Sequence, residues 1–224
     1  MLVDGGPRED YLFNFLKRKQ IKKIDLLVLS HPDADHIVGF FRVLEALDVR
    51  EIWHSGFDKS HFLMRKLLLL AEQKRIRVRT LPELLGEHDF GKSQVTVLAP
   101  AEFDPENTTN NNSLVIKVSF GADSALWPGD LESEKERSAD SSWRANILKA
   151  PHHGSKSSSS EHLVRTVMPE HVIFCTQAEN NFGFPHPNIK KRWEDARAKT
   201  WETGTQGKID IILTGSGVLV ESYL

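Results

Sequence analysis

One short stretch limits what this chain can fold into: a largely apolar run, residues 24–29, leads directly into the sequence SHPDADHIVG at residues 30–39. The run has the length of a buried strand, and residues 37–47 return to the spacing of an amphipathic helix. Between them lie two histidines and two aspartates: His31, Asp33, Asp35 and His36. The stretch therefore predicts a strand–loop–helix unit whose loop is either a charged turn or one half of a metal site.

The rest of the chain alternates predicted helices with predicted strands. Further helices are expected at residues 8–19, 60–74, 131–140, 161–167 and 188–199. Further strands are expected at residues 49–55, 76–81, 93–100, 113–121, 124–129, 145–150, 171–176 and 208–214. Residues 82–93 are expected to form a polar loop, and a Gly-Ala-Asp turn near residue 122 suggests a hairpin. Alternation with added hairpins predicts an α/β fold with mixed sheets covered by helices on their outer faces.

Length and composition fit one globular domain over residues 1–224. Hydrophobic residues make up 39% of the chain and charged residues 27%, which is ordinary for a soluble protein. No window approaches the roughly 18–20 apolar residues that a membrane span needs, and the N-terminus lacks a basic region followed by an apolar stretch. We therefore expect a cytoplasmic protein that is not associated with membranes.

Charge and cysteine content narrow the choice of partners. The net charge is −2, so contact with nucleic acid must rely on local basic segments, of which residues 17–23 and 74–79 are the clearest. Each segment is either a solvated face or a rim that follows phosphates. The single cysteine, Cys175, excludes an intramolecular disulfide, and its apolar neighbours predict a buried, inert thiol.

Several polar residues follow the ends of other predicted strands, or lie in the loops after them. They are Asp4, Asp130, His152, His153 and His186. Strand ends on one side of a sheet are where α/β proteins gather their active sites, so we expect these residues to converge with the cluster at 31–36. A mixed set of His and Asp suits Zn²⁺, Mn²⁺ or Fe²⁺, whereas Mg²⁺ and Ca²⁺ prefer all-oxygen shells.

The spacing within the cluster fits a pair of ions. In an extended segment residues 31, 33 and 35 point the same way, and His36 can turn toward a second ion as the helix begins. Two metals about 3.5–4 Å apart could then be bridged by a carboxylate and a hydroxide, which would generate a nucleophile near neutral pH. The cluster thus predicts hydrolytic chemistry if the other half of the site is present.

The cluster HPDADH resembles the metallo-beta-lactamase superfamily, whose signature is His-x-His-x-Asp-His; this chain has Asp33 where the second histidine usually stands. That variant, together with VDGG, WPGDLE, LKAPHHGS and NFGFPHP in this order, looks like the metallo-hydrolase domain of bacterial DNA-uptake (competence) proteins. The resemblance implies an αββα sandwich with a dinuclear site at the rim between its sheets, here lacking or shortened in its first N-terminal strands.

The resemblance also implies roles for the residues of the first half-site. His31 and Asp33 would hold one metal, and Asp35 and His36 would hold the other. Asp35 would in addition take part in catalysis. Asp4 matches an aspartate that orients the ligands without binding metal itself.

The later motifs supply the second half-site. Asp130 falls where the superfamily has its bridging aspartate. Either His152 or His153 would bind the second metal while the other serves the substrate or a proton; we assign His152 to the metal and His153 to catalysis. His186 resembles a late histidine that polarises the substrate or completes a site. The usual third-motif histidine is absent, and Asn110–Asn112 stand there. Either Asn111 or Asn112 binds a metal weakly or contacts the substrate, or the run only forms a turn.

The predicted function is a metal-dependent hydrolase with two divalent ions, Zn or Mn, that acts as a phosphodiesterase or nuclease on nucleic acid or another phosphodiester. A first alternative is a hydrolase of a small ester, lactone or nucleotide at the same site. A second alternative is a non-catalytic or partner-dependent regulatory subunit with a degraded site. In that case a protein partner or a second copy of the chain would complete the first sheet.

Overall fold

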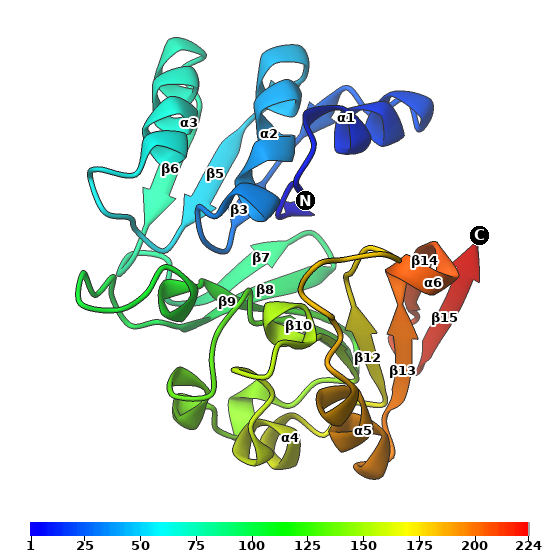
Figure 1. Cartoon of the computed structure of the whole chain (residues 1–224). Coiled ribbons are helices and arrows are strands. Elements are labelled where there is room, and N and C mark those ends of the chain that lie inside the picture. The colour runs from blue at the N-terminus through cyan, green and yellow to red at the C-terminus, as the bar shows by residue number, and fades with distance from the viewer. Residues whose placement is uncertain (224) are drawn as a thin grey trace. The chain divides into compact units, whose positions relative to one another are not determined.

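The computed structural model describes residues 1–223, and its contacts divide the chain into two compact units (Figure 1). The first unit comprises Met1–Leu85 and Ala99–Leu114, and the second comprises Gly86–Leu98 and the residues from Val115 on. No helix within residues 1–223 combines the length and apolarity needed to cross a membrane. The prediction of a single domain over residues 1–224 stays a prediction.

The first unit is built on a four-stranded parallel sheet with its strands in chain order. The strands are β1 (Leu2–Val3), β3 (Leu27–Leu29), β5 (Glu51–His54) and β6 (Arg77–Thr80), with a separate short pair, β2 (Lys23–Ile24) and β4 (Asp48–Val49). The connecting helices are α1 (Glu9–Arg18), α2 (Ala34–Ala46) and α3 (Phe62–Gln73), which run along one face of the sheet (Figure 1). Because the strands are parallel, the loops after β1, β3 and β5 emerge at the same edge.

The apolar run at residues 24–29 forms the centre of this unit. It contains two short strands, β2 and β3, which are separated by the exposed Asp25 and by Leu26 and belong to different sheets. All three residues of β3 are fully buried, as expected for a central parallel strand. Helix α2 buries an apolar stripe in the same core: Ile37, Phe40, Phe41, Val43 and Leu44. The strand–loop–helix prediction for this stretch is confirmed.

Two glycines let the turn after β1 touch α2. A Cβ atom on Gly39 would lie 1.9 Å from the carbonyl oxygen of Gly5, and one on Gly5 would lie 2.7 Å from the backbone nitrogen of Phe40. Any side chain at either position would force the two segments apart. Glycine is therefore required on both sides, and the turn that carries Asp4 is fixed against the start of α2.

The second unit is built on a seven-stranded mixed sheet. In order across the sheet its strands are β13 (Lys199–Glu202), β12 (His171–Phe174), β11 (Ile147–Lys149), β10 (Asp123–Trp127), β9 (Val115–Phe120), β8 (Ser93–Ala99) and β7 (Gly86–Phe90). Neighbouring strands from β10 to β13 are parallel, whereas β9–β10 and β7–β8 are antiparallel pairs. The predicted hairpin at residues 113–129 is confirmed, and loops after the parallel strands again share one edge.

Three helices and a hairpin complete this unit: α4 (Glu161–Val167), α5 (Pro187–Asp195), α6 (Thr203–Gln206), and the strands β14 (Lys208–Leu213) and β15 (Val218–Tyr223). Apolar side chains of the hairpin pack on Ala125, Ile147, Ile173 and Trp201 of the sheet. The Ser160 hydroxyl, at the end of the serine run 157–160, caps α4 by accepting a hydrogen bond from the Leu163 backbone.

Four predictions for this unit are wrong. Residues 131–140 form only short 3₁₀ turns, because the Glu136 carboxylate is drawn inside to accept hydrogen bonds from two backbone N–H groups, those of Ser159 and Ser160. The polar loop at 82–93 contains β7, which pairs with β8. The helix expected at 188–199 ends at Asp195. Cys175 is exposed rather than buried because β12 ends one residue before it.

Candidate metal centre

The residues of the first half-site follow β3. His31 lies in the loop, Asp33 precedes α2, and Asp35 and His36 belong to the first turn of that helix. Both imidazoles are buried, with side chains 1–2% exposed, while the side chains of Asp33 and Asp35 are 43% and 51% exposed. The two imidazole rings lie 4.1 Å apart between centroids. The structure thus brings together all four residues of the cluster, with its imidazoles inside and its carboxylates outside.

Both histidines are oriented in the same way. His31 Nδ1 lies 3.0 Å from the Ser30 hydroxyl, and His36 Nδ1 lies 2.8 Å from an Asp4 carboxylate oxygen. Each Nε2 faces a carboxylate: His31 Nε2 is 3.7 Å from Asp33, and His36 Nε2 is 3.8 Å from Asp35. An Nδ1 held by a protein oxygen fixes the ring orientation and leaves Nε2 as the ligand atom, as in many metal sites.

Asp4 lies behind these ligands, in a backbone conformation that favours glycine (φ 56°). Its carboxylate also accepts hydrogen bonds from the Ser30 backbone N–H at 2.8 Å and the Ser30 hydroxyl at 2.9 Å. Burial raises the pKa of Asp4, but the neighbouring His36, Ser30 and His31 lower it further, so the net pKa lies below its ordinary value. Asp4 is therefore a charged anchor for His36, which matches the predicted orienting role.

In the second unit the corresponding carboxylate is buried. Asp130 follows β10, and its side chain is 4% exposed. One of its oxygens, Oδ1, accepts a hydrogen bond from the Lys149 ammonium at 2.9 Å, and the other, Oδ2, lies 3.2 Å from His153 Nε2. His153 Nδ1 lies 2.7 Å from the backbone carbonyl oxygen of Cys175. His153 thus has the same arrangement as His31 and His36: Nδ1 held by the protein and Nε2 facing a carboxylate.

His152 points elsewhere. Its Nδ1 lies 3.2 Å from the Ser157 hydroxyl and 3.6 Å from Glu132, and its ring meets Phe184 edge to face. Burial lowers the pKa of His152, which the charges of Asp130 and Glu132 only partly offset, so the imidazole is neutral at neutral pH. Of the two adjacent histidines, it is His153 whose Nε2 faces Asp130.

The backbone at His152 and His153 is strained. Both residues have a left-handed conformation, with φ of 46° and 53°. This conformation costs about 1–2 kcal/mol per residue when a side chain is present, and it persists only where the surroundings enforce it. The next residue, Gly154, also has a positive φ (84°), and a Cβ there would lie 2.8 Å from Phe174 and Pro185 side-chain atoms. The PHHGS motif is therefore a tight turn that aims two adjacent imidazoles in different directions.

His186 reaches the same turn through its backbone. Its N–H donates to the carbonyl oxygen of Gly154 at 2.9 Å, and its ring Nδ1 accepts a hydrogen bond from the Asn188 backbone at 3.3 Å, capping α5. The asparagine run at 110–112 lies in the first unit, where the Asn112 side chain binds the backbone of Asp104 and Thr108. Asn112 therefore holds its own loop, as predicted for a turn former.

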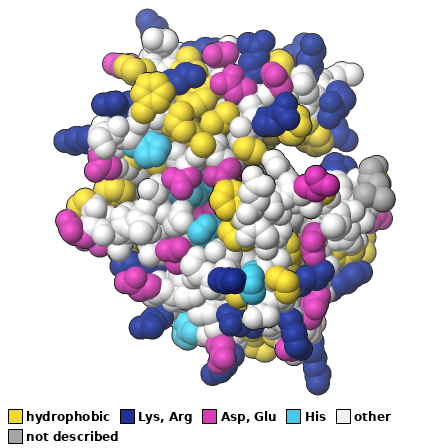
Figure 2. All heavy atoms as spheres, in the orientation of Figure 1, with side chains coloured by type: hydrophobic (Ala, Val, Ile, Leu, Met, Phe, Trp, Pro, Cys, Tyr) yellow, Lys and Arg dark blue, Asp and Glu magenta, His cyan; other side chains and the backbone are white. Residues whose placement is uncertain are grey.

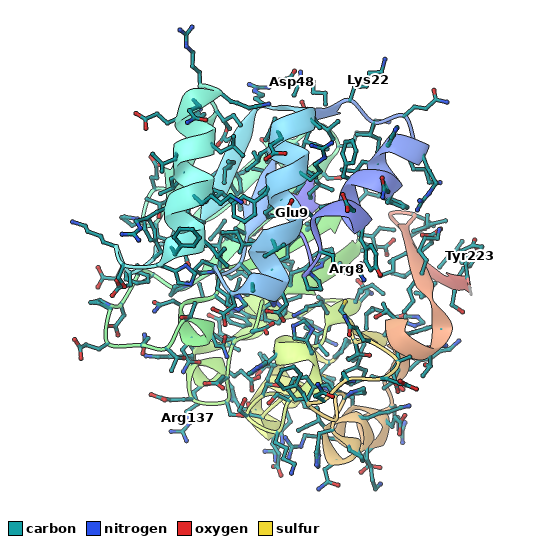
Figure 3. All side chains as sticks on the ribbon, turned by 45° about the horizontal axis from the view of Figure 1, so that its top comes forward. Arg8, Glu9, Lys22, Asp48, Arg137 and Tyr223 are labelled. Carbon is teal, nitrogen blue, oxygen red and sulfur yellow. The ribbon has the colours of Figure 1, made fainter. Side chains whose placement is uncertain are left out.

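The basic segments lie at the other edge of the first unit. Residues 17–23 precede or begin β2, and residues 74–77 precede or begin β6, whereas His31 follows the carboxyl end of its strand. Figure 2 shows Lys and Arg side chains gathered around the top of this unit, and Figure 3 shows Lys22 close to Asp48 there. These segments therefore do not line the candidate ligands.

Three further residues of interest were not predicted as site residues. Lys149 and Ser30 directly contact Asp130 and His31. His54 ends β5, at the same edge as His31, and burial lowers its pKa to about 4, so its imidazole is neutral. The available signal for Lys149 was a charged residue within the apolar strand ILKA, and for Ser30 and His54 a polar residue at a strand end.

Comparison with known proteins decides the family. A sequence profile of the metallo-beta-lactamase superfamily matches residues 1–177. The chain belongs to the metallo-beta-lactamase superfamily. Among solved structures, a variant of the beta-hydroxylase CmlA aligns with a TM-score of 0.53 at 13% identity, covering 81% of this chain and 43% of that chain. The α/β metallo-beta-lactamase fold predicted from the motifs is thus confirmed.

Curated relatives extend the likeness along the chain. ComE operon protein 3 of Bacillus subtilis (strain 168) is 29% identical over 206 residues, which is 90% of this chain and 26% of the relative. Recombination protein 2 of Haemophilus influenzae is 26% identical over 210 residues, which is 92% of this chain and 24% of the relative. Competence protein ComA of Neisseria gonorrhoeae is 26% identical over 203 residues, which is 88% of this chain and 26% of the relative. The chain spans about a quarter of the length of these relatives, and the resemblance to competence proteins is confirmed.

Family membership supports metal-dependent hydrolysis as the general class of activity. The donor atoms of each unit fit that class. Each unit presents imidazole nitrogens, held in a fixed orientation, next to carboxylate oxygens. This is a donor set suited to divalent transition-metal ions.

Proposed function

We propose that this chain is a metal-dependent phosphodiesterase that acts on nucleic acid. The observation that carries the proposal is the common orientation of His31, His36 and His153. Each has Nδ1 next to a protein oxygen at 2.7–3.0 Å and Nε2 facing a carboxylate oxygen at 3.2–3.8 Å. Three imidazoles fixed in this way are difficult to explain as loop residues and fit a metal site.

The proposed centre takes ligands from both half-sites and holds two ions, Zn²⁺ or Mn²⁺. The candidate ligands are His31, Asp33, Asp35, His36, Asp130 and His153. In this proposal His153, rather than His152, is the imidazole ligand of the second unit, because its Nε2 faces Asp130. Asp130 would be the carboxylate that bridges the two ions, as the resemblance implies.

Two divalent ions bound there would lower the pKa of a water molecule and neutralise charge that develops on a phosphate. The protein groups hold the ligands ready for this chemistry. Asp4 and Ser30 fix the tautomers of His36 and His31, so that Nε2 carries the ligand lone pair. His152, which is neutral at neutral pH, is proposed to accept a proton from the attacking water, and His186 is proposed to contact the substrate.

Two observations favour a phosphodiester substrate. Asp33 adds a carboxylate where the superfamily signature has a histidine, so the ligand set is richer in oxygen and better suited to Mn²⁺. Two of the relatives are named for recombination and for competence, processes that involve DNA. A cytoplasmic location, and a partner or second copy that completes the first sheet, stay predictions.

The test combines metal analysis with a substrate panel. The chain is loaded with Mn²⁺ or Zn²⁺, dialysed, and assayed for bound metal and for turnover of bis-p-nitrophenyl phosphate, linear single-stranded DNA and an acyl lactone. Asp33→Ala and Asp130→Asn remove proposed ligands, while Glu179→Gln changes an exposed carboxylate of the second unit and serves as the control. We expect two ions per chain and phosphodiester turnover in the wild type and the control. In the ligand variants we expect fewer bound ions and the loss of turnover.

The panel also separates the alternatives. Turnover of the lactone without turnover of either phosphodiester would overturn the proposed substrate class. Bound metal without turnover of any of the three would favour the regulatory alternative. Absence of bound metal in the wild type would overturn the metal centre itself.

A further inference from the structure

Lys149 is a charged residue in a place where charge is costly. It ends β11 after Ile147 and Leu148, in the middle of the seven-stranded sheet, and its side chain is only 9% exposed. Burying an ammonium group costs several kcal/mol unless it is paired and hydrogen-bonded. A lysine at this position therefore needs an explanation that packing alone does not provide.

The sheet register brings this ammonium to Asp130. Strands β10 and β11 are parallel, with Leu126 opposite Leu148, so Lys149 lies beside the segment that leaves β10. Its Nζ donates to Asp130 Oδ1 at 2.9 Å and to the carbonyl oxygen of Gly129 at 3.0 Å. Two acceptors on consecutive residues fix the position of the ammonium and, through it, the rotation of the carboxylate.

The two oxygens of Asp130 consequently have different surroundings. Oδ1 is engaged by Lys149, and Oδ2 faces His153 Nε2 at 3.2 Å. A carboxylate whose one oxygen is held by an ammonium group presents the other as its better metal donor. A chelating arrangement, in which both oxygens bind one ion, would place that ion next to the Lys149 ammonium, and repulsion between the two positive charges disfavours it.

We propose that Lys149 is a positioning residue that restricts Asp130 to binding metal through Oδ2 alone. The inference rests on the proposed metal centre and adds to it the side chain that sets the coordination of the bridging carboxylate. Lysine suits this task because its ammonium is a compact point charge that can engage one oxygen. Arginine would carry the same charge, but its planar fork tends to engage both oxygens of a carboxylate.

Replacing Lys149 with arginine therefore keeps the positive charge and changes only the geometry of its hydrogen bonds to Asp130, which provides a test. Mn²⁺ and Zn²⁺ are titrated into the full-length wild type, Lys149→Arg and Lys149→Met, with EPR of the Mn²⁺-loaded forms to detect coupling between two bridged ions. Lys117→Met is the matched control, because Lys117 lies on β9, two strands away in the same sheet, and binds the Ser142 carbonyl oxygen instead. Circular dichroism in the presence of EDTA checks the fold of each variant.

We expect the wild type and Lys117→Met to bind two coupled ions. Both Lys149 variants should bind the second ion about 10–100-fold more weakly and lose the coupling signal, the usual range for loss of a residue that orients a ligand. In an Asp130→Asn background, Lys149→Arg should cause no additional loss. If Lys149→Met does not fold, Lys149→Arg alone decides the outcome, since it keeps the buried cation.

Two results would overturn the inference, and they are distinguishable. A folded Lys149→Arg that binds two coupled ions with wild-type affinity would refute the positioning role and leave the proposed metal centre intact. A wild type that binds no ion would refute the metal centre, and the role of Lys149 with it.

Discussion

Both half-sites place carboxylates next to imidazoles, but the carboxylates differ in how far they are exposed to solvent. In the first unit the carboxylates that face the imidazoles, those of Asp33 and Asp35, are 43% and 51% exposed. In the second unit the carboxylate of Asp130 is 4% exposed and is paired with a buried lysine. The first half-site can therefore lose a carboxylate with little effect on folding, whereas in the second half-site the candidate ligand is also part of the core.

The largest expected difference comes from removing one carboxylate from each half-site. Asp130→Ala breaks a buried ion pair and should lower the free energy of unfolding by about 3–5 kcal/mol. Asp35→Ala removes an exposed side chain and should change it by no more than about 0.5 kcal/mol. Urea unfolding of both variants with EDTA present measures the difference, and equal effects would break the comparison.

The two units should also respond to pH in opposite directions. Burial lowers the pKa of His54 in the first unit to about 4, and burial raises the pKa of Glu136 in the second. For His54 the unfolded chain binds the proton more readily, so stability is lost as pH falls from 6.5 toward 4, by up to about 3 kcal/mol. For Glu136 the folded chain binds the proton more readily, so stability is lost as pH rises through the window above 4.5.

Urea unfolding between pH 4 and 7 checks these signs. His54→Asn keeps an acceptor for the Gly56 backbone N–H, which His54 Nδ1 binds at 3.1 Å, and should remove the loss of stability at low pH. Glu136→Gln should remove the opposite trend. An unchanged pH profile in either variant would contradict the assignment for that unit.

A smaller effect is expected from the groups behind the ligands. Asp4→Asn would place an amide donor near His36 Nδ1, which moves the proton of the imidazole to Nε2 and blocks it as a ligand. Metal affinity should fall about 10–100-fold. His153 is held by a backbone carbonyl, so Cys175→Ala is the matched variant and should leave metal affinity unchanged. Metal titration of both proteins makes the comparison.

The smallest effect separates the strained turn of the second unit from the relaxed loop of the first. His152 has a φ of 46°, whereas Asp33 has a φ of −65°. His152→Gly and His152→Ala both remove the imidazole, but the glycine variant should be more stable by about 1–2 kcal/mol. At Asp33 the glycine variant should not be the more stable one. Thermal unfolding of the four variants checks the expectation, and equal stabilities at His152 would contradict it.

The first half-site was predictable from sequence because it is local. A buried strand, a cluster of four ligand-type residues and a helix follow one another within residues 24–46, and each has its own signal. Asp4 was predicted from its motif alone. Its contact with His36 depends on the pairing of β1 with β3, which the sequence does not display.

The second half-site was less predictable because it depends on contacts between distant segments. The pairing of β10 with β11 determines which carboxylate Lys149 contacts. Residues 131–140 do not form the expected helix, because the Glu136 carboxylate accepts hydrogen bonds from the backbone at the start of α4. Nothing in PHHGS predicts two successive left-handed residues, a geometry that determines which histidine faces Asp130. Motif order therefore indicated the candidate residues, whereas the orientation of their side chains follows only from the tertiary structure.

The most direct test of the account is the number of metal ions bound by the wild-type chain and by two variants, Asp35→Asn and Asp130→Asn, after loading with Mn²⁺ and dialysis. The account predicts two ions in the wild type and fewer in both variants, since both half-sites supply ligands in the proposed centre. A wild type that retains no Mn²⁺ or Zn²⁺, or variants that retain as much as the wild type, would contradict it.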